Sequence, residues 1–249
     1  MSTRPVTIAH PDKRALAAET AERALVVLAE AQEERGEATV VLTGGSMGAA
    51  VLAALAASPR RDRVDWSRVN VWWSDERFVA EDSPERNYRQ AVDAVGGALA
   101  LNADRVHPVG SSSDFASADD AALDYREELA AAGAAEHSAE GLPRFDLSLL
   151  GLGPDGHVAS LFPGLPHVHE QEATVLGVEG SPKPPPVRVT MTLPLVNAAR
   201  RVWFLVAGPD KAEAVAAVRS GAPLDRTPGA GVHGTEETLL LVTEDALGG

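Results

Sequence analysis

Asp155 and His157 stand two residues apart in a glycine-rich segment and are the side chains of the sequence best suited to acid–base chemistry. The segment directly follows an apolar run, residues 145–150, that is typical of a buried strand. Imidazole titrates near neutral pH, which makes a histidine a natural general base for activating water. A carboxylate at this spacing can orient the ring or stabilise its cationic form. The competing interpretation is a histidine that only forms hydrogen bonds within a tight loop.

The same segment matches the G-x-G-x-x-G pattern of dinucleotide-binding proteins, through Gly151, Gly153 and Gly156. That pattern must open a helix long enough to lead back to a parallel strand. Pro163 and Pro166 interrupt the chain soon afterwards, so the helix would be too short. A nicotinamide-dependent oxidoreductase is therefore disfavoured, and a titration with NAD or NADP would test it.

A second glycine-rich turn, Thr43-Gly44-Gly45-Ser46-Met47-Gly48, lies between a predicted strand and an alanine-rich predicted helix. Such a turn directs free backbone N–H groups and the positive end of the helix dipole toward the crevice at the sheet edge. Anions bind well there, and glycines let the backbone approach them closely. We predict Gly44, Gly45 and Ser46 as anion-binding residues. A purely structural turn with Ser46 as the helix N-cap is an equally good interpretation.

Charged side chains follow the next predicted strand, residues 69–73, in the segment Ser74-Asp75-Glu76-Arg77-Phe78. Open α/β sheets bind their ligands at such strand ends. Three ionisable groups directly after an apolar strand cannot all be buried unpaired, so they pair with one another or face a polar pocket. Asp75 and Arg77 are candidate site residues on the second interpretation. An ion pair of Asp75 or Glu76 with Arg77 at a rim is the alternative.

Arg188 and Lys211 add two isolated cations, one near a predicted strand end and one at a predicted helix start. Either could hold a phosphate, and either could form a surface ion pair, which is the commoner case for exposed cations.

A zinc site is the other interpretation of the region after His157, because His167, His169 and Glu170 follow it closely. Two prolines separate the first two histidines, and the sequence has no helical i, i+4 histidine pair there. The spacing matches no metal-ligand pattern, so we predict no metal.

The overall charge limits the partners of the protein. Lys+Arg 22 and Asp+Glu 36 give a formal net charge of −14, which repels nucleic acid and anionic lipid. Physiological salt screens this field beyond about 8 Å, so a few local cations can still hold a phosphate. The aromatic content of 4% also argues against a nucleic-acid surface. With no cysteine, no apolar run of membrane-spanning length and no apolar leader in residues 1–10, we expect a cytoplasmic protein.

Short β-branched runs alternate with longer amphipathic stretches along the 249 residues, of which 45% are hydrophobic. This pattern predicts an α/β fold with an open, doubly wound, mostly parallel sheet, a modified Rossmann-like arrangement with helices on both faces. One domain, residues 1–249, is the simplest organisation. The expected strands are residues 39–42, 69–73, 145–150 and 202–207. The expected helices are residues 16–34, 47–57, 84–95, 118–132 and 209–219, with Pro84 and Pro209 in first turns and Gly36 and Gly133 at ends.

Taken in order, several segments together resemble the 6-phosphogluconolactonase family, the lactone hydrolases of the oxidative pentose phosphate pathway. The segments are residues 43–47, residues 74–79 with Asn87 after them, and residues 151–162, 188–192 and 208–212. The family is similar in fold, and in its Gly-x-Asp-Gly-His loop, to the glucosamine-6-phosphate deaminases.

The resemblance implies hydrolysis of 6-phospho-D-glucono-1,5-lactone, a small sugar-phosphate lactone, to 6-phosphogluconate without metal or cofactor. Together with the residue chemistry it gives His157 the acid–base role and Asp155 the role of supporting the ring. The residues it places around the substrate are Gly44, Gly45, Ser46, Asp75, Arg77, Arg188 and Lys211. It names no group that would stabilise an oxyanion.

Two alternatives share the expected fold. In the deaminases the histidine is followed by a segment ending in Asn-Glu-Pro, whose glutamate serves ring opening, whereas residues 158–163 here contain no carboxylate. A non-catalytic sugar-phosphate sensor would bind the ligand without turnover. The sequence departs from the lactonase pattern at Val158, where threonine is common, and at residues 242–245, which lack the usual Trp-plus-Asp ending. The oligomeric state stays open between a monomer and a weak dimer.

Overall fold

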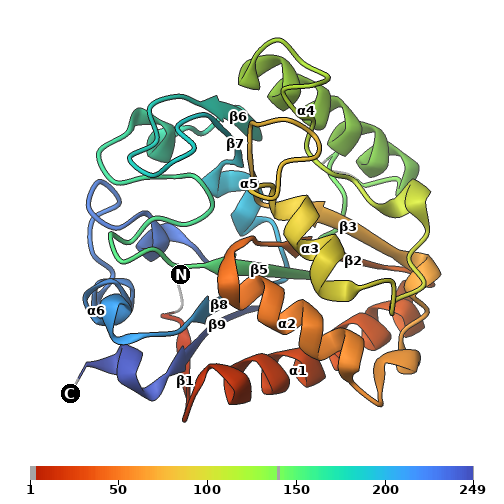
Figure 1. Cartoon of the computed structure of the whole chain (residues 1–249), viewed down its shortest axis with the longest axis horizontal. Helices are drawn as coiled ribbons and strands as arrows, with labels where there is room; N and C mark the ends of the chain where they lie inside the picture. The colour runs from red at the N-terminus through yellow and green to blue at the C-terminus, as the bar shows by residue number, and fades with distance from the viewer. Residues whose placement is uncertain (1–3, 139–140, 249) are drawn as a thin grey trace.

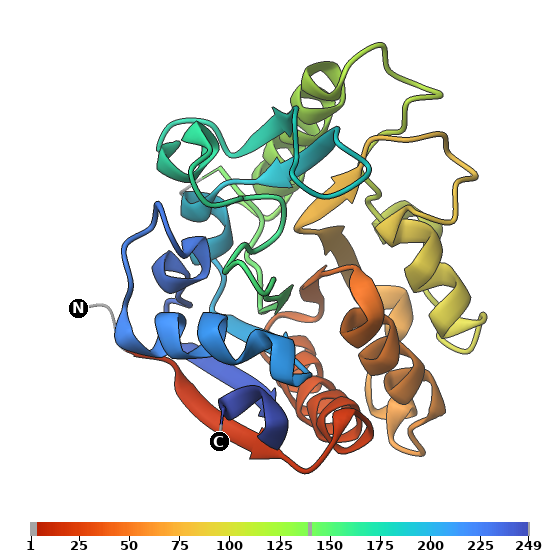
Figure 2. The same ribbon diagram turned by 60° about the vertical axis from the view of Figure 1, so that its left-hand side comes forward.

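A sheet of parallel strands forms the centre of the molecule (Figures 1 and 2). The structure is a computed structural model that describes residues 4–138 and 141–248. Within these residues the main sheet has six strands in the order β1-β9-β8-β5-β2-β3, and all neighbours are parallel. In chain order the strands are β1 Val6–His10, β2 Ala38–Leu42, β3 Val69–Trp73, β5 Leu147–Gly151, β8 Arg201–Val206 and β9 Glu237–Thr243.

Helices cover both faces of this sheet, which confirms the predicted α/β class. One face carries α1 (Lys13–Arg35), α2 (Gly45–Ala57) and α3 (Asn87–Val95). The other carries α4 (Ala118–Ala135), α5 (Leu193–Asn197) and α6 (Ala212–Ser220). In the described part of the chain, no helix combines the length and the apolar character that crossing a bilayer requires.

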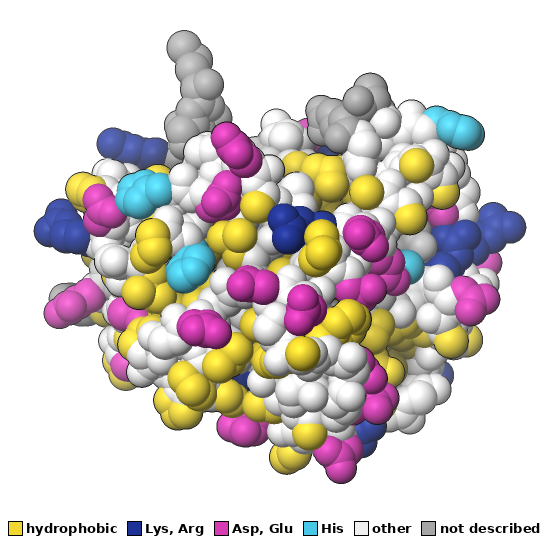
Figure 3. All heavy atoms as spheres, turned by 90° about the horizontal axis from the view of Figure 1, so that it is seen from above, with side chains coloured by type: hydrophobic (Ala, Val, Ile, Leu, Met, Phe, Trp, Pro, Cys, Tyr) yellow, Lys and Arg dark blue, Asp and Glu magenta, His cyan; other side chains and the backbone are white. Residues whose placement is uncertain are grey.

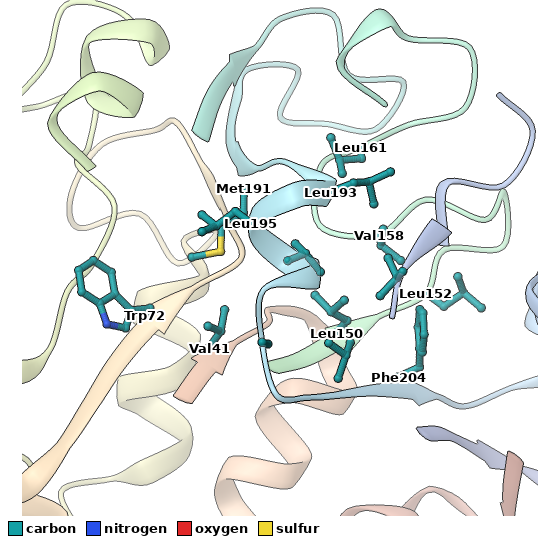
Figure 4. Packing of buried hydrophobic residues seen from close by; sticks show 14 of the residues in the cluster. Val41, Trp72, Leu150, Leu152, Val158, Leu161, Met191, Leu193, Leu195 and Phe204 are labelled. Carbon is teal, nitrogen blue, oxygen red and sulfur yellow. The ribbon is translucent and has the colours of Figure 1, made fainter. Parts of the chain in front are cut away.

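Central strands contribute side chains to both of the resulting cores. In β2, Val40 and Leu42 pack under α1 and α2, whereas Val41 packs into the opposite core. Successive side chains of a strand point to opposite faces, so a sheet covered on both sides needs apolar residues at every position. Figure 4 shows Val41 with Leu150 of β5 and Phe204 of β8 in that second core. This double burial explains the continuous apolar runs that the sequence shows.

A small second sheet, which the sequence analysis did not predict, lies beside the main one. It consists of β4 (Asp75–Arg77), β7 (Arg188–Met191) and β6 (Val175–Val178) in the order β4-β7-β6, with both pairs antiparallel. Only Ser74 separates β3 from β4 along the chain. All three residues of β4 are charged, so no apolar periodicity marked it as a strand. The pairing places Arg77 opposite Arg188.

Several helix boundaries differ from the prediction. The last helix, α6, begins at Ala212, because Pro209 lies in a separate 3-10 turn, Pro209–Lys211, before it. The third helix begins at Asn87 rather than at Pro84, because a distant carboxylate holds its first amides, as described below. Gly133 does not end α4, which continues to Ala135. A Cβ on Gly133 would lie 2.5 Å from backbone atoms of residues 141 and 142, so this glycine allows a close approach of the chain instead of a helix stop. Gly36, in a left-handed conformation, does end α1 as expected.

Glu76 of β4 is the carboxylate that caps α3. Its side chain is buried and accepts hydrogen bonds from the backbone N–H groups of Asn87 (2.6 Å) and Tyr88 (2.9 Å). The buried guanidinium of Arg86 lies 3.6 Å away and compensates the charge. Burial raises the pKa of Glu76, and the N–H groups and Arg86 oppose this effect. One side chain thus joins the second sheet to the helix that follows it.

Replacing Glu76 by Ala should lower the free energy of unfolding by about 3 to 5 kcal/mol, because Arg86 would be left as an unpaired buried charge. Urea denaturation followed by circular dichroism measures this change. The matched control is Glu85→Ala, an exposed carboxylate of the same segment, which should change stability by less than about 0.5 kcal/mol. Equal losses in the two variants would contradict the capping role.

Candidate active site

The turns that follow β2, β3, β5 and β8 meet at one edge of the molecule. These strands are parallel, so their carboxyl ends lie together. β2 and β5 are neighbours, but the chain leads from β2 to β3 on one side and from β5 toward β8 on the other. A crevice forms where connections diverge in this way, and α/β proteins bind ligands there.

A polar cleft occupies this position and encloses about 620 Å³, its open mouth included, which is typical of sites for small molecules. Its described lining includes most of the predicted site residues. The lining consists of Thr43, Gly44, Gly45, Asp75, Arg77, Asn87, Gly151, Leu152, Gly153, His157, Ala159, Lys183, Arg188 and Lys211. Two predicted residues are not part of this described lining: Ser46 lies in the first turn of α2, and Asp155 faces a neighbouring hollow beside Gly156 and Thr227.

His157 and Asp155 form the hydrogen bond that their spacing predicts. His157 Nδ1 lies 2.5 Å from Asp155 Oδ1, and the ring packs against Phe162 at a centroid distance of 4.6 Å. Partial burial alone would raise the pKa of Asp155, but the hydrogen bond and charge of His157, with the charge of Lys183, hold it well below its ordinary value. An ionised carboxylate only accepts, so Nδ1 carries the proton of this bond. Nε2 is then the ring nitrogen that remains free to accept a proton.

Gly153 makes room for this pair. A Cβ at this position would lie 1.9 Å from His157 Nδ1 and 2.4 Å from Asp155 Oδ1. A hydrogen bond from the N–H of Gly153 to the carbonyl oxygen of His157 (2.9 Å) closes this loop. No helix follows Gly156 within the described residues before a short 3-10 turn, Pro166–His169. The glycines therefore shape a loop around a histidine and do not occur in the context of a dinucleotide-binding helix.

The first glycine turn opens α2, but Ser46 is not its cap. Gly44 is the N-cap residue and Ser46 lies inside the helix, so the structural interpretation of Ser46 is wrong. Gly45 has φ +80°, a left-handed conformation that glycine adopts without strain. A Cβ on Gly44 would lie 1.8 Å from Asn87 Oδ1, so the turn also needs glycine for its contact with α3. The N–H of Gly45 donates to Gln90 Oε1 at 3.2 Å, a bond that an incoming anion would have to replace.

Asp75 and Arg77 both reach the cleft from β4. Asp75 is buried and accepts hydrogen bonds from Asn87 Nδ2 (3.0 Å) and Ser160 Oγ (2.7 Å). Arg77 donates from Nη1 to the carbonyl of Glu85 at 2.5 Å. The expected rim ion pair of Arg77 with Asp75 or Glu76 is not among the salt bridges of the described residues. Both side chains thus face a polar pocket.

Arg188 and Lys211 also line the cleft, but they differ in how firmly other groups hold their side chains. Arg188 of β7 is buried and donates from Nε to the carbonyl of Pro185 (2.7 Å) and from Nη2 to those of Lys183 and Pro184 (3.1 Å each). Burial lowers the pKa of Arg188, and the charge of Asp75 opposes this effect. Lys211 lies in the 3-10 turn Pro209–Lys211 and pairs with Asp210 at 3.3 Å.

Lys183 is a cleft residue that the sequence analysis missed. Its Nζ lies 3.2 Å from His157 Nδ1 and 3.4 Å from Asp155 Oδ1. It belongs to the proline-rich run 182–186, which appeared irregular and therefore carried no expected function. The rarity of lysine was a usable signal, because the whole sequence contains three, at positions 13, 183 and 211. In the structure the last two of these line the cleft.

The cleft is locally cationic although the protein is acidic. Its described lining contains Arg77, Lys183, Arg188 and Lys211 but a single carboxylate, Asp75. Figure 3, by contrast, shows acidic side chains spread over one face of the surface. In residues 4–138 and 141–248 no three side chains of the metal-ligating types cluster so that they could hold an ion, and His169 contacts Asp225 at 2.6 Å. The cleft thus combines an acid–base pair with cations suited to an anionic ligand.

Fold and cleft together define an α/β protein with a polar, cationic cleft at the carboxyl edge of its sheet. The sequence matches the family model described as glucosamine-6-phosphate isomerases/6-phosphogluconolactonase over residues 11–241. The chain belongs to this family.

Relatives of the chain in sequence and in structure support this assignment. The 6-phosphogluconolactonase of Streptomyces coelicolor is 50% identical over 248 residues, which cover 99% of this chain and 95% of that protein. The 6-phosphogluconolactonase of Mycobacterium tuberculosis is 44% identical over 238 residues, which cover 95% of this chain and 94% of that protein. The crystal structure of the 6-phosphogluconolactonase of Thermotoga maritima is 27% identical, with a TM-score of 0.82, and the match covers 96% of this chain and 100% of that one.

Gly153→Ala should lower kcat by about 10²-fold or more while the protein still folds, because the added methyl group displaces the His157 ring rather than backbone. Steady-state kinetics and thermal unfolding, measured on the same preparation, separate the two effects. Wild-type kcat in the variant would show that the position of the ring does not matter for turnover.

Proposed function

We propose that the protein hydrolyses 6-phospho-D-glucono-1,5-lactone to 6-phospho-D-gluconate in the oxidative pentose phosphate pathway, by general-base activation of water and without a metal ion or cofactor. The observation that carries this proposal is the His157 ring, fixed by Asp155 through Nδ1 in a cationic cleft. The substrate that we propose for the protein is a charged metabolite, which fits an enzyme of the cytoplasm. The relatives named above, which cover nearly the whole chain, support the same assignment.

In the first step, His157 Nε2 accepts a proton from water as the water oxygen forms a bond to the lactone carbonyl carbon. The carbonyl π electrons move to oxygen and give a tetrahedral intermediate. Asp155, ionised and bonded to Nδ1, stabilises the imidazolium. When the intermediate collapses, the carbon–oxygen bond of the ring breaks and the imidazolium gives its proton to the departing oxygen. His157 ends neutral, and the product is the open-chain acid.

The phosphate group is proposed to bind at the first glycine turn. The backbone N–H groups of Gly44, Gly45 and Ser46 stand at the N-terminus of α2, a 13-residue helix whose dipole favours an anion. Arg77, Arg188 and Lys211 are the candidate cations around the substrate. Asp75 would accept hydrogen bonds from sugar hydroxyls, because its buried oxygens already face donors of this kind.

A deaminase would need an acid–base carboxylate in the segment after the histidine, and this chain has none there. Residues 158–163 contain none, and Val158, Leu161 and Phe162 are buried in the core, where they hold the histidine loop in place. Ser160 of the same segment donates a hydrogen bond from Oγ to Asp75 Oδ2 at 2.7 Å. A sensor without turnover would have no use for a fixed imidazole with a free nitrogen.

A coupled assay tests the proposal. Freshly generated phosphogluconolactone is supplied, spontaneous hydrolysis is subtracted, and ammonia release from glucosamine 6-phosphate is measured in parallel. We expect lactone hydrolysis that persists after treatment with a metal chelator, and no ammonia. Ammonia release, or binding of 6-phosphogluconate without lactone turnover, would contradict the proposal in favour of the deaminase or the sensor.

His157→Ala should lower kcat by about 10² to 10⁴, the usual contribution of a positioned general base. Affinity for 6-phosphogluconate, measured by calorimetry, should change little, because the ring is not assigned to the phosphate. Unchanged turnover would remove His157 from the mechanism.

Arg77→Ala should chiefly raise KM for the phosphorylated lactone, because we assign the guanidinium to the phosphate. Kinetics with unphosphorylated D-glucono-1,5-lactone provide the control, since that substrate has no group for Arg77 to hold. A comparable loss with both lactones would argue against the phosphate role.

A further inference from the structure

Lys183 is placed beside the acid–base pair in a way that the mechanism above does not use. Its ammonium group lies 3.2 Å from His157 Nδ1 and 3.4 Å from Asp155 Oδ1. Because Nδ1 carries a proton directed at Asp155, it has no lone pair for Lys183. The ammonium has three donors, and Asp155 can accept one of them. The remaining donors are available to a ligand in the cleft, which Lys183 lines.

The loop that carries Lys183 is held by its own backbone. Ser181 Oγ accepts a hydrogen bond from the N–H of Lys183 (3.2 Å) and donates one to its carbonyl (2.9 Å). Arg188 Nη2 donates to the same carbonyl at 3.1 Å. Prolines on both sides restrict the backbone further, since each fixes its own φ. Both backbone polar groups of Lys183 are thus satisfied, so the loop fixes the point from which the lysine side chain extends into the cleft.

The other cations of the cleft are arranged differently. Arg188 uses Nε and Nη2 to hold the lysine loop, and Arg77 uses Nη1 on the carbonyl of Glu85. Lys211 pairs with the neighbouring Asp210. In the described lining, Lys183 is the cation within hydrogen-bond distance of the catalytic imidazole. The carbonyl carbon must lie close to that imidazole during attack, on the side of Nε2. The long side chain of Lys183, which lines the same cleft, can reach the oxygen attached to that carbon.

We propose that Lys183 donates to the lactone carbonyl oxygen and stabilises the oxyanion of the tetrahedral intermediate; this inference rests on the proposed lactonase function. The negative charge appears on that oxygen when water adds, and it leaves when the ring carbon–oxygen bond breaks. Lys183 keeps its proton throughout, and His157 carries out both proton transfers. A cationic donor that lines the cleft stabilises negative charge where it develops.

The same placement predicts how the product binds. Hydrolysis turns the carbonyl carbon into a carboxylate, whose oxygens occupy the position of the oxyanion. Lys183 should therefore recognise the carboxylate of 6-phosphogluconate. An analogue with a hydroxymethyl group in its place, glucitol 6-phosphate, keeps the phosphate and the chain but gives Lys183 no charge to bind.

The kinetic test compares Lys183→Met and Lys183→Arg with the wild type on phosphorylated and unphosphorylated gluconolactone. Removing one oxyanion donor typically lowers kcat by about 10² to 10³. We expect a loss of this size in Lys183→Met on both lactones, and recovery of at least about tenfold in Lys183→Arg, which keeps a cationic donor. Lys13→Met is the control and should behave as wild type, because Lys13 is an exposed residue of α1 outside the described lining of the cleft.

Two kinetic outcomes would overturn the inference. A loss confined to the phosphorylated lactone and expressed in KM would show that Lys183 binds phosphate. A kcat within about threefold of the wild type on both substrates would show that it binds neither charge. Circular dichroism and thermal unfolding on each variant establish that any loss occurs in a folded protein.

A binding test separates this inference from the proposed function, because it needs no turnover. Calorimetry should show that the wild type prefers 6-phosphogluconate to glucitol 6-phosphate, and that Lys183→Met removes most of this preference. If the wild type hydrolyses the lactone but the preference is unchanged in Lys183→Met, the inference on Lys183 is wrong. If the preference depends on Lys183 but no lactone is hydrolysed, the proposed function fails and the carboxylate site remains.

Discussion

The hydrogen bond between Asp155 and His157 is the interaction on which the proposed chemistry of this protein depends. It directs Nδ1 toward the carboxylate and leaves Nε2 as the nitrogen that we propose acts as the base. The bond exists because the loop after β5 contains no side chain at Gly153, where a methyl group would overlap the ring. Phe162 and the buried residues around it hold the other side of the imidazole. A rigid apolar core thus fixes one polar pair at the sheet edge.

Most of the charges close to this pair differ in sign from the net charge of the protein. The protein carries a net charge of −14, yet its cleft gathers four cations, which suits the proposed substrate, an anion of the same sign as the protein. Screening makes this possible, because charges on the outer surface act weakly beyond about 8 Å at physiological salt. The fold brings these cations from separate elements: Arg77 from β4, Arg188 from β7, Lys183 from the loop before β7, and Lys211 from the turn after β8.

Local signals predicted the parts of the structure that local physics determines. The apolar runs of β2, β3, β5 and β8 and the glycine turns after β2 and β5 were foreseen because burial and backbone freedom leave direct traces in the sequence. The small antiparallel sheet left no such trace, since β4 consists of three charged residues that become a strand only by pairing with β7. Glu76 capping α3 and Lys183 beside His157 are contacts between distant segments, which spacing along the chain does not show.

The protonation pattern of the His157 ring tests the central claim most directly. Nitrogen-15 NMR of the imidazole, assigned by comparison with a His157→Gln variant, distinguishes the two neutral tautomers. The spectrum should be taken at a pH above about 8.5, where imidazoles are generally neutral. The account predicts a proton on Nδ1 and a lone pair on Nε2. A proton on Nε2, with Nδ1 accepting from Lys183, would contradict it, because the ring would then have no base facing the substrate.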